Sequence, residues 1–206
     1  MIVSALKQTS PEHITVTLED GQELKTTLGV VTDLRLFSGR DLEEAELAHF
    51  RQESARALAR ERALTILSQR QMSARELARK LRDKGVEEDT AAWCVDWTLE
   101  HGLIDEESYA AAIVRHYSTK GYGEGRVRQE LQRRGLPREL WEEALSAMPE
   151  DAGETKLDRF IAARLKNPGD RDAVRKVSAA LYRRGYSGEE IRAALARFNT
   201  EAEYEE

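Results

Sequence analysis

The first forty residues show the apolar and polar pattern of short strands. Residues 13–18 (HITVTL) are rich in β-branched side chains, a turn-forming Glu-Asp-Gly follows, and residues 23–27 can return as a second strand. A third apolar run covers residues 30–37. The pattern predicts three short strands, and because so small a sheet is marginal by itself, we expect it to pack on the rest of the chain.

From residue 41 onward the spacing of apolar positions becomes helical. Asp41 is the expected N-cap, with Glu43 and Glu44 in the first turn, where carboxylates suit the helix dipole. No proline interrupts the chain between Asp41 and Leu136. Apolar residues recur at three- and four-residue spacing, at Leu42, Leu47, Phe50, Leu58, Leu64, Ile66 and Leu67. The chain is therefore predicted to be mostly α-helical.

One helical pattern recurs three times, at intervals of 50 residues. In each copy a leucine is followed four residues later by a glycine, which suits the left-handed position after a helix end. The aligned leucines and glycines are Leu81, Leu131 and Leu181, then Gly85, Gly135 and Gly185. An apolar residue follows each glycine and can close the helix end: Val86, Leu136 and Tyr186. Three matches in one register indicate an internal repeat.

An amphipathic segment precedes each copy of this pattern, and another follows it. The preceding segments are roughly 55–68, 106–118 and 154–165, and the following ones are 89–101, 138–148 and 188–198. We therefore predict an elongated, curved array of three tandem three-helix repeats behind a small N-terminal β-containing segment. The expected division is a β-rich segment at 1–40, a linker helix and first repeat at 41–104, further repeats at 105–152 and 153–199, and an acidic tail at 200–206.

Composition narrows the function classes. The chain has 206 residues, of which 34% are charged, and no stretch approaches the 18 uncharged apolar residues of a spanning helix. The N-terminus lacks the basic head and apolar run of a signal peptide. A single cysteine, Cys94, cannot form an internal disulfide and fits a reducing compartment. These features predict a cytoplasmic protein that does not associate with membranes.

Catalytic and metal-binding signatures are missing from the sequence. The four histidines and Cys94 lack metal-ligand spacing, and neither a GxSxG elbow nor a P-loop occurs. We expect a protein that is not an enzyme, with no cofactor and no metal. The glycine-rich stretch 120–126 (KGYGEGR) has two interpretations, an anion site before a helix or a tight loop between packed helices. The tight loop is favoured, because the spacing is not a nucleotide fingerprint.

Basic residues cluster where the repeat recurs, although the net charge of the chain is -6. The windows 70–84, 126–138 and 171–184 each carry a net charge of +4 on the middle helix of a repeat. One such window is usually a solvated helix face, but three in register predict a recurring basic surface for an acidic polymer or an acidic protein groove. Few aromatic residues are interleaved, so base stacking is not indicated.

The chain resembles the RecX family of bacterial regulatory proteins. The resemblance is carried by ALTILSQR at 63–70, SARELARKL at 73–81, LEHGLIDE at 99–106 and GYGEGRVRQEL at 121–131, and it covers about residues 54–199. It implies a regulator of the RecA recombinase, usually an inhibitor, that lies along the groove of the RecA–DNA filament and reduces ATP hydrolysis and strand exchange. It also implies that the RecA filament is the partner.

The candidate partner-binding residues combine the basic windows with this resemblance. They are Arg75, Arg79, Lys80, Arg126, Arg128, Arg133 and Arg134. Two alternatives stay open: a helical adaptor, or a protein that binds single- or double-stranded DNA directly through the helices at 73–85 and 89–101. The chain is expected to be a monomer. The acidic net charge counts against sequence-specific DNA reading.

Overall fold

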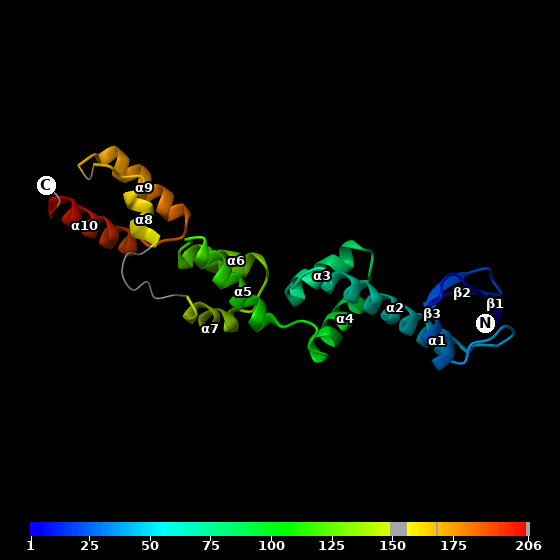
Figure 1. Cartoon of the computed structure of the whole chain (residues 1–206). Helices are drawn as coiled ribbons and strands as arrows, with labels where there is room; N and C mark the ends of the chain where they lie inside the picture. The colour runs from blue at the N-terminus through cyan, green and yellow to red at the C-terminus, as the bar shows by residue number, and fades with distance from the viewer. Residues whose placement is uncertain (149–155, 168, 205–206) are drawn as a thin grey trace. The chain divides into compact units, whose positions relative to one another are not determined.

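The computed structural model describes residues 1–148, 156–167 and 169–204 (Figure 1). The chain divides into two compact units, Met1–Ile104 and Asp105–Glu206. The first unit contains a small sheet and four helices, and the second contains helices alone among its described residues. No helix in these ranges is long and apolar enough to cross a membrane.

The N-terminal segment is a three-stranded antiparallel sheet in the order β1-β2-β3. The strands are β1 (Val3–Gln8), β2 (His13–Leu18) and β3 (Glu23–Thr27). Two of the predicted strands are confirmed. The third, at 30–37, was wrong, because Leu28–Asp33 forms helix α1, which Thr27 caps by accepting a hydrogen bond from the Val30 N–H.

The missing strand, β1, comes from a stretch that gave no strand signal. It is an edge strand in which Val3 alone is buried, so the stretch lacks the regular alternation of a half-buried strand. The sheet packs its apolar face on the long helix that contains Phe50. Val3, Val16 and Phe50 are fully buried in this core.

Helix α2 (Glu44–Leu67) continues from the sheet into the first repeat (Figure 1). The predicted N-cap, Asp41, was wrong by two residues, because Glu43 is the N-cap and shares a capping box with Glu46. One side of α2 is fixed to the sheet by the buried hydrogen bond from Ser54 Oγ to Thr26 Oγ1, at 2.9 Å. Its other end packs against α3 and α4.

Three tandem three-helix domains come next, as the repeat predicted. The first consists of the end of α2 with α3 (Ala74–Asp83) and α4 (Glu88–Glu100). The second has α5 (Glu106–Thr119), α6 (Glu124–Arg133) and α7 (Trp141–Ser146), with a 3-10 turn, η1 (Arg138–Leu140), before α7. The third has α8 (Lys156–Ala162), α9 (Arg171–Arg183) and α10 (Gly188–Tyr204). The expected boundary at residue 152 lies outside the described residues.

Each three-helix domain has its own core, and the repeated leucine lies at the centre of it. Leu81, Leu131 and Leu181 are fully buried and belong to three separate apolar clusters. The three cap glycines have φ angles of +79°, +70° and +89°. After each glycine the next N–H donates to the carbonyl of the repeated leucine, at 3.1 to 3.3 Å. The predicted cap is confirmed in all three repeats.

Candidate partner-binding surface

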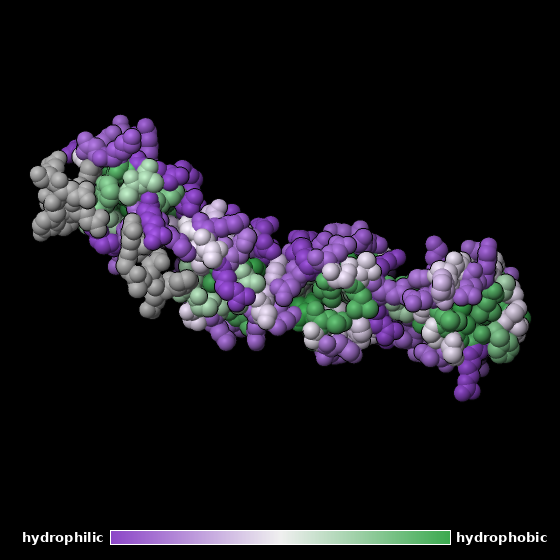
Figure 2. All heavy atoms as spheres, in the orientation of Figure 1, coloured by the Kyte–Doolittle hydropathy of each residue, from purple (hydrophilic) through white to green (hydrophobic). Residues whose placement is uncertain are grey.

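The basic residues of α3 lie on the side of the helix that faces away from the core. Ser73 and Glu76 form a capping box that sets where α3 begins, and this register turns Leu77 and Leu81 inward. Arg75 and Arg79, four residues apart, are therefore exposed on one stripe. Figure 2 shows hydrophilic residues covering the outer side of α3 and apolar ones where it faces α4.

Lys80 lies beside this stripe and lines a groove between the sheet and the helices α2 and α3. The groove has a volume of about 880 Å³. Lys84, Lys25 from β3 and Arg62 from α2 complete its cationic lining. The opposing charge comes from Glu61, which is already paired with His13, with 2.7 Å between Nε2 and Oε2. The groove is therefore basic.

Lys25 and Arg62 were missed by the sequence analysis. Lys25 lies in the acidic N-terminal stretch and Arg62 in the middle of a mixed-charge helix, so neither belongs to a basic window. Only the packing of β3 and α3 on the same helix brings them to Lys80. No local signal in the sequence could have found them.

The basic residues of α6 and of its C-cap, Arg134, divide into one available residue and three that pair with carboxylates of the same domain. Arg126 is exposed and bonds only a neutral amide among its described contacts, Gln129 Oε1 at 3.2 Å. Arg128 is clamped between two carboxylates, with Nε 2.6 Å from Glu124 and Nη1 2.8 Å from Glu142. Hydrogen bonding to Glu142 and Glu124 raises the pKa of Arg128.

Arg133 and Arg134 are both bound to a buried carboxylate. Glu130 is 2% exposed and accepts hydrogen bonds from the two guanidinium groups. The hydrogen bond from Arg133, followed by that from Arg134, lowers the pKa of Glu130 to about 2, although burial acts in the opposite direction. Arg134 also donates to the Tyr109 hydroxyl on α5. These two arginines stabilise the second three-helix domain.

The glycine-rich stretch 120–126, which includes the first residues of α6, is a packing contact. The N–H groups of Gly123 and Gly125 donate to the carbonyls of Arg184 and Gly185, at 2.9 and 3.0 Å. A Cβ on Gly123 would lie 2.6 Å from the Gly185 carbonyl oxygen, so only glycine permits this approach. The interpretation as a tight loop is confirmed. The amides that an anion would need are already used.

The third basic window is partly structural as well. Arg184 donates to the carbonyls of Lys120 and Gly121 and lies over the rings of Tyr122 and Phe160. Arg183 and Lys176 are exposed.

Among the described residues no group of histidine, cysteine and carboxylate side chains could hold a metal ion. Cys94 is buried, and burial raises the pKa of its thiol to about 11, so it is not a reactive thiolate.

Comparison with known proteins gives one consistent result. The sequence models of the first, second and third three-helix domains of RecX match residues 59–97, 105–145 and 162–195. A regulatory protein RecX of Xanthomonas axonopodis pv. citri (strain 306) is 40% identical over 143 residues, which cover 68% of this chain and 87% of that protein. Another, from Vibrio parahaemolyticus, is 35% identical over 141 residues, 66% of this chain and 89% of that protein.

Solved structures show the same fold. A crystal structure described as regulatory protein RecX superposes with a TM-score of 0.71 at 22% identity and covers 95% of this chain and 98% of its own. RecX from Lactobacillus salivarius gives a TM-score of 0.60 at 19% identity and covers 71% of this chain and 97% of its own.

Proposed function

Because the chain belongs to the RecX family of regulatory proteins, we propose that it regulates the RecA recombinase without being an enzyme itself. In this proposal it binds along the groove of the RecA–DNA filament and inhibits ATP hydrolysis and strand exchange. It acts in the cytoplasm as a monomer and needs no cofactor.

The observation that carries the proposal is the exposed basic stripe of α3 beside a basic groove. Within the described structure, Arg75, Arg79 and Lys80 form no ion pair with this chain, although carboxylates outnumber cations overall. Cations kept together without an internal partner repel one another, and an anionic partner relieves this repulsion. The DNA of the filament offers phosphate groups.

The internal ion pairs narrow the set of contact residues. Arg128, Arg133 and Arg134 already bind carboxylates of their own domain, and using them for a partner would first break these contacts. Arg126 is available. We therefore assign the principal contacts to Arg75, Arg79 and Lys80, with the groove cations Lys25, Arg62 and Lys84, and with Arg126.

The test is the DNA-dependent ATPase of RecA, measured with the DNA in excess and with increasing amounts of this protein. The wild-type chain should reduce the rate. The double charge reversal Arg75→Glu and Arg79→Glu should raise the concentration needed for half-inhibition at least about tenfold, since losing charge-assisted contacts typically weakens binding by about 1.4 kcal/mol or more. Full inhibition by this variant would contradict the assignment.

A matched control is available on helices outside this surface. Arg115 on α5 and Arg192 on α10 are exposed and have no ion pair in the described part of the chain, so their double reversal to glutamate changes the net charge equally. This control should inhibit nearly as well as wild type. An equal loss of inhibition in both variants would show that net charge alone determines the effect on the RecA ATPase.

Direct DNA binding remains the alternative, and the basic groove favours it. Lys25, Arg62, Lys80 and Lys84 converge from three elements, as expected for contacts to a phosphate backbone. Excess DNA separates the two functions, because a protein that only competes for DNA is then titrated away. Inhibition that disappears at high DNA concentration, with tight binding to DNA alone, would favour the alternative.

A further inference from the structure

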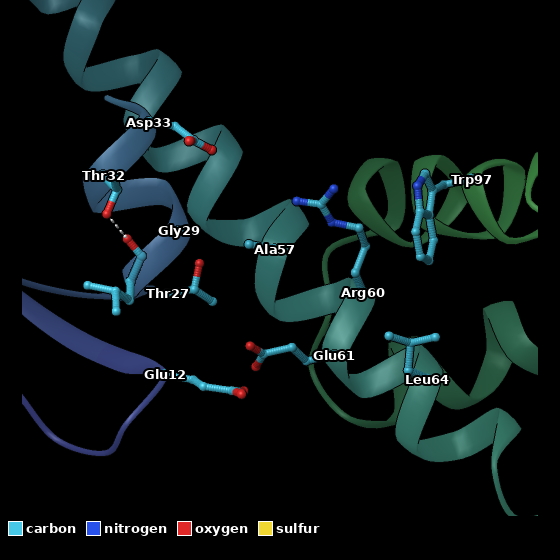
Figure 3. Close-up of a pocket in the computed structure, with 11 residues that line it drawn as sticks. Glu12, Thr27, Gly29, Thr32, Asp33, Ala57, Arg60, Glu61, Leu64 and Trp97 are labelled. Carbon is cyan, nitrogen blue, oxygen red and sulfur yellow. Dashed lines mark hydrogen bonds between the residues drawn. The ribbon is translucent and has the colours of Figure 1, made fainter. Parts of the chain in front are cut away.

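A second groove lies in the first unit and adjoins the basic one at Glu61, which lines both. Figure 3 shows it between α1, α2 and α4, with a volume of about 680 Å³. Its apolar lining includes Leu28, Leu64 and Trp97. Leu28 and Leu64 are each 45% exposed, whereas the core leucines Leu77 and Leu81 are completely buried. Large apolar side chains gathered in an open groove are typical of a binding site.

The edge of this groove is acidic. The carboxylates of Glu12, Asp33 and Glu61 line one side of the groove, and Leu64 and Trp97 lie together on the other (Figure 3). Glu61 is paired with His13, but Glu12 and Asp33 have no ion pair among the described residues. The cation of the lining, Arg60, lies over the Trp97 ring, 5.8 Å from its centroid. The groove therefore combines apolar side chains with a net negative edge.

We propose that this groove binds a segment of a protein partner in which large apolar side chains are flanked by lysine or arginine. The apolar side chains would cover Leu28 and Leu64, and the cations would meet Glu12 and Asp33. The groove is open along α2, so a small molecule would leave much of its own surface in water, unlike ligands of enclosed pockets. A peptide segment can lie along it instead.

The groove is already formed in the chain by itself. Its wall from the sheet side is fixed to α2 by the Ser54–Thr26 hydrogen bond and by the contact between His13 and Glu61, 2.9 and 2.7 Å long. Binding to a preorganised groove avoids the loss of conformational entropy that ordering it would require. This inference is independent of RecA as the partner and would stand if the proposed function failed.

The test uses the full chain and three short fluorescent peptides. The first is built of leucine and lysine with the leucines at helical spacing, the second replaces leucine by serine, and the third replaces lysine by glutamate. Only the first should bind in fluorescence anisotropy titrations. In NMR spectra the indole N–H signal of Trp97 should shift on binding, while that of Trp141 in the second unit should not.

Matched variants locate the site. Leu64→Gln should weaken binding of the leucine–lysine peptide at least about tenfold, since the exposed apolar surface of Leu64 that the peptide covers contributes to affinity in proportion to its area. Leu99→Gln is the control, because Leu99 is 41% exposed and lies outside the groove. Circular dichroism melting checks that both variants fold.

Several results would overturn the proposal. They are no binding of the first peptide, equal binding of the serine peptide, or equal effects of the two leucine variants. An oligomer of this chain that dissociates on Leu64→Gln would also overturn it and assign the groove to a second copy.

Discussion

At the scale of single residues, the cap glycines share one conformation but differ in their surroundings. Gly85 has a φ of +79° and nothing within 4 Å of the position that a Cβ would take. Gly185 has a φ of +89°, and its Cβ would lie 2.1 Å from the backbone nitrogen of Arg126. At Gly85 a glycine is needed only for the cap, whereas at Gly185 it is needed for both the cap and the close packing.

This difference predicts unequal effects of alanine at the two positions. Gly85→Ala should lower the free energy of unfolding by about 1–2 kcal/mol, the cost of a Cβ at positive φ. Gly185→Ala should lower it by several kcal/mol, because the backbone of the glycine-rich stretch must also move. Urea unfolding of the two variants measures this, and equal effects would contradict the close approach.

The buried carboxylate of Glu130 makes stability depend on pH. Its pKa is lowered to about 2 in the folded chain from an ordinary value of 4.5, chiefly by hydrogen bonds from Arg133 and Arg134. A carboxyl with a depressed folded pKa stabilises fully above its unfolded pKa, and this contribution is lost as the pH falls from about 4.5 toward 2.

Glu130→Gln should therefore destabilise the second three-helix domain by about 1–3 kcal/mol at pH 7 and by much less near pH 2.5. Glutamine keeps the shape of the side chain but cannot carry the charge that the two arginines bind. Urea titrations at the two pH values measure the difference. A loss of stability in Glu130→Gln that is the same at both pH values would show that the charge of Glu130 does not contribute to the stability of this domain.

At the scale of elements, Arg75 and Arg79 on α3 have a different role from Arg128 on α6, although both helices lie in similar basic windows of the sequence. Arg75 and Arg79 project from α3 into solvent. Arg128 joins α6 to α7 through a two-pronged contact with Glu142, at 2.8 and 3.1 Å, and also holds Glu124 one turn away. Arg75 and Arg79 are free for a partner, whereas Arg128 holds two helices together.

Charge reversal should separate these two roles. Arg128→Glu places three carboxylates together and should lower the melting temperature by a few degrees, whereas Arg75→Glu should leave it nearly unchanged. The second change Glu142→Arg should restore part of the stability of Arg128→Glu by reversing the pair. Calorimetry measures all three proteins, and an unaffected Arg128→Glu variant would show that the contact with Glu142 contributes nothing.

At the scale of the whole molecule, the chain consists of two units with separate cores. The sheet, α2 and the first three-helix domain lie in Met1–Ile104, and the other two domains lie in Asp105–Glu206. Within the second unit, the described contacts of the glycine-rich stretch with Gly185 link the second and third domains. Each unit thus has the internal contacts that cooperative folding requires.

We expect residues 1–104 and residues 105–206 to fold when produced separately. Each fragment should unfold in a single cooperative calorimetric transition, because its apolar clusters are complete without the other unit. A fragment with helical circular dichroism but no transition would contradict this division. If the proposed function holds, neither fragment should inhibit RecA as well as the full chain, since fewer contacts act together.

The parts of the fold that the sequence predicted correctly are those in which neighbours along the chain decide the structure. The cap after Leu81 needs only a glycine four residues later and an apolar residue after it, so all three caps could be found. Strands β2 and β3 were found because a turn signal joins them. The edge strand β1 was missed, because its hydrogen bonds to β2 rather than its own composition make it a strand.

The sequence by itself thus determined the three-helix repeats and their caps, since these depend on local spacing, and its motifs carried the resemblance to the family. Only the tertiary structure decided which cations are available. Lys25 joins Lys80 in one groove, and Arg128 is occupied by Glu142, through contacts between elements that charge counting along the chain cannot see. The physical reason is that an ion pair depends on distance in space, and the sequence specifies that distance only after helices and strands have packed.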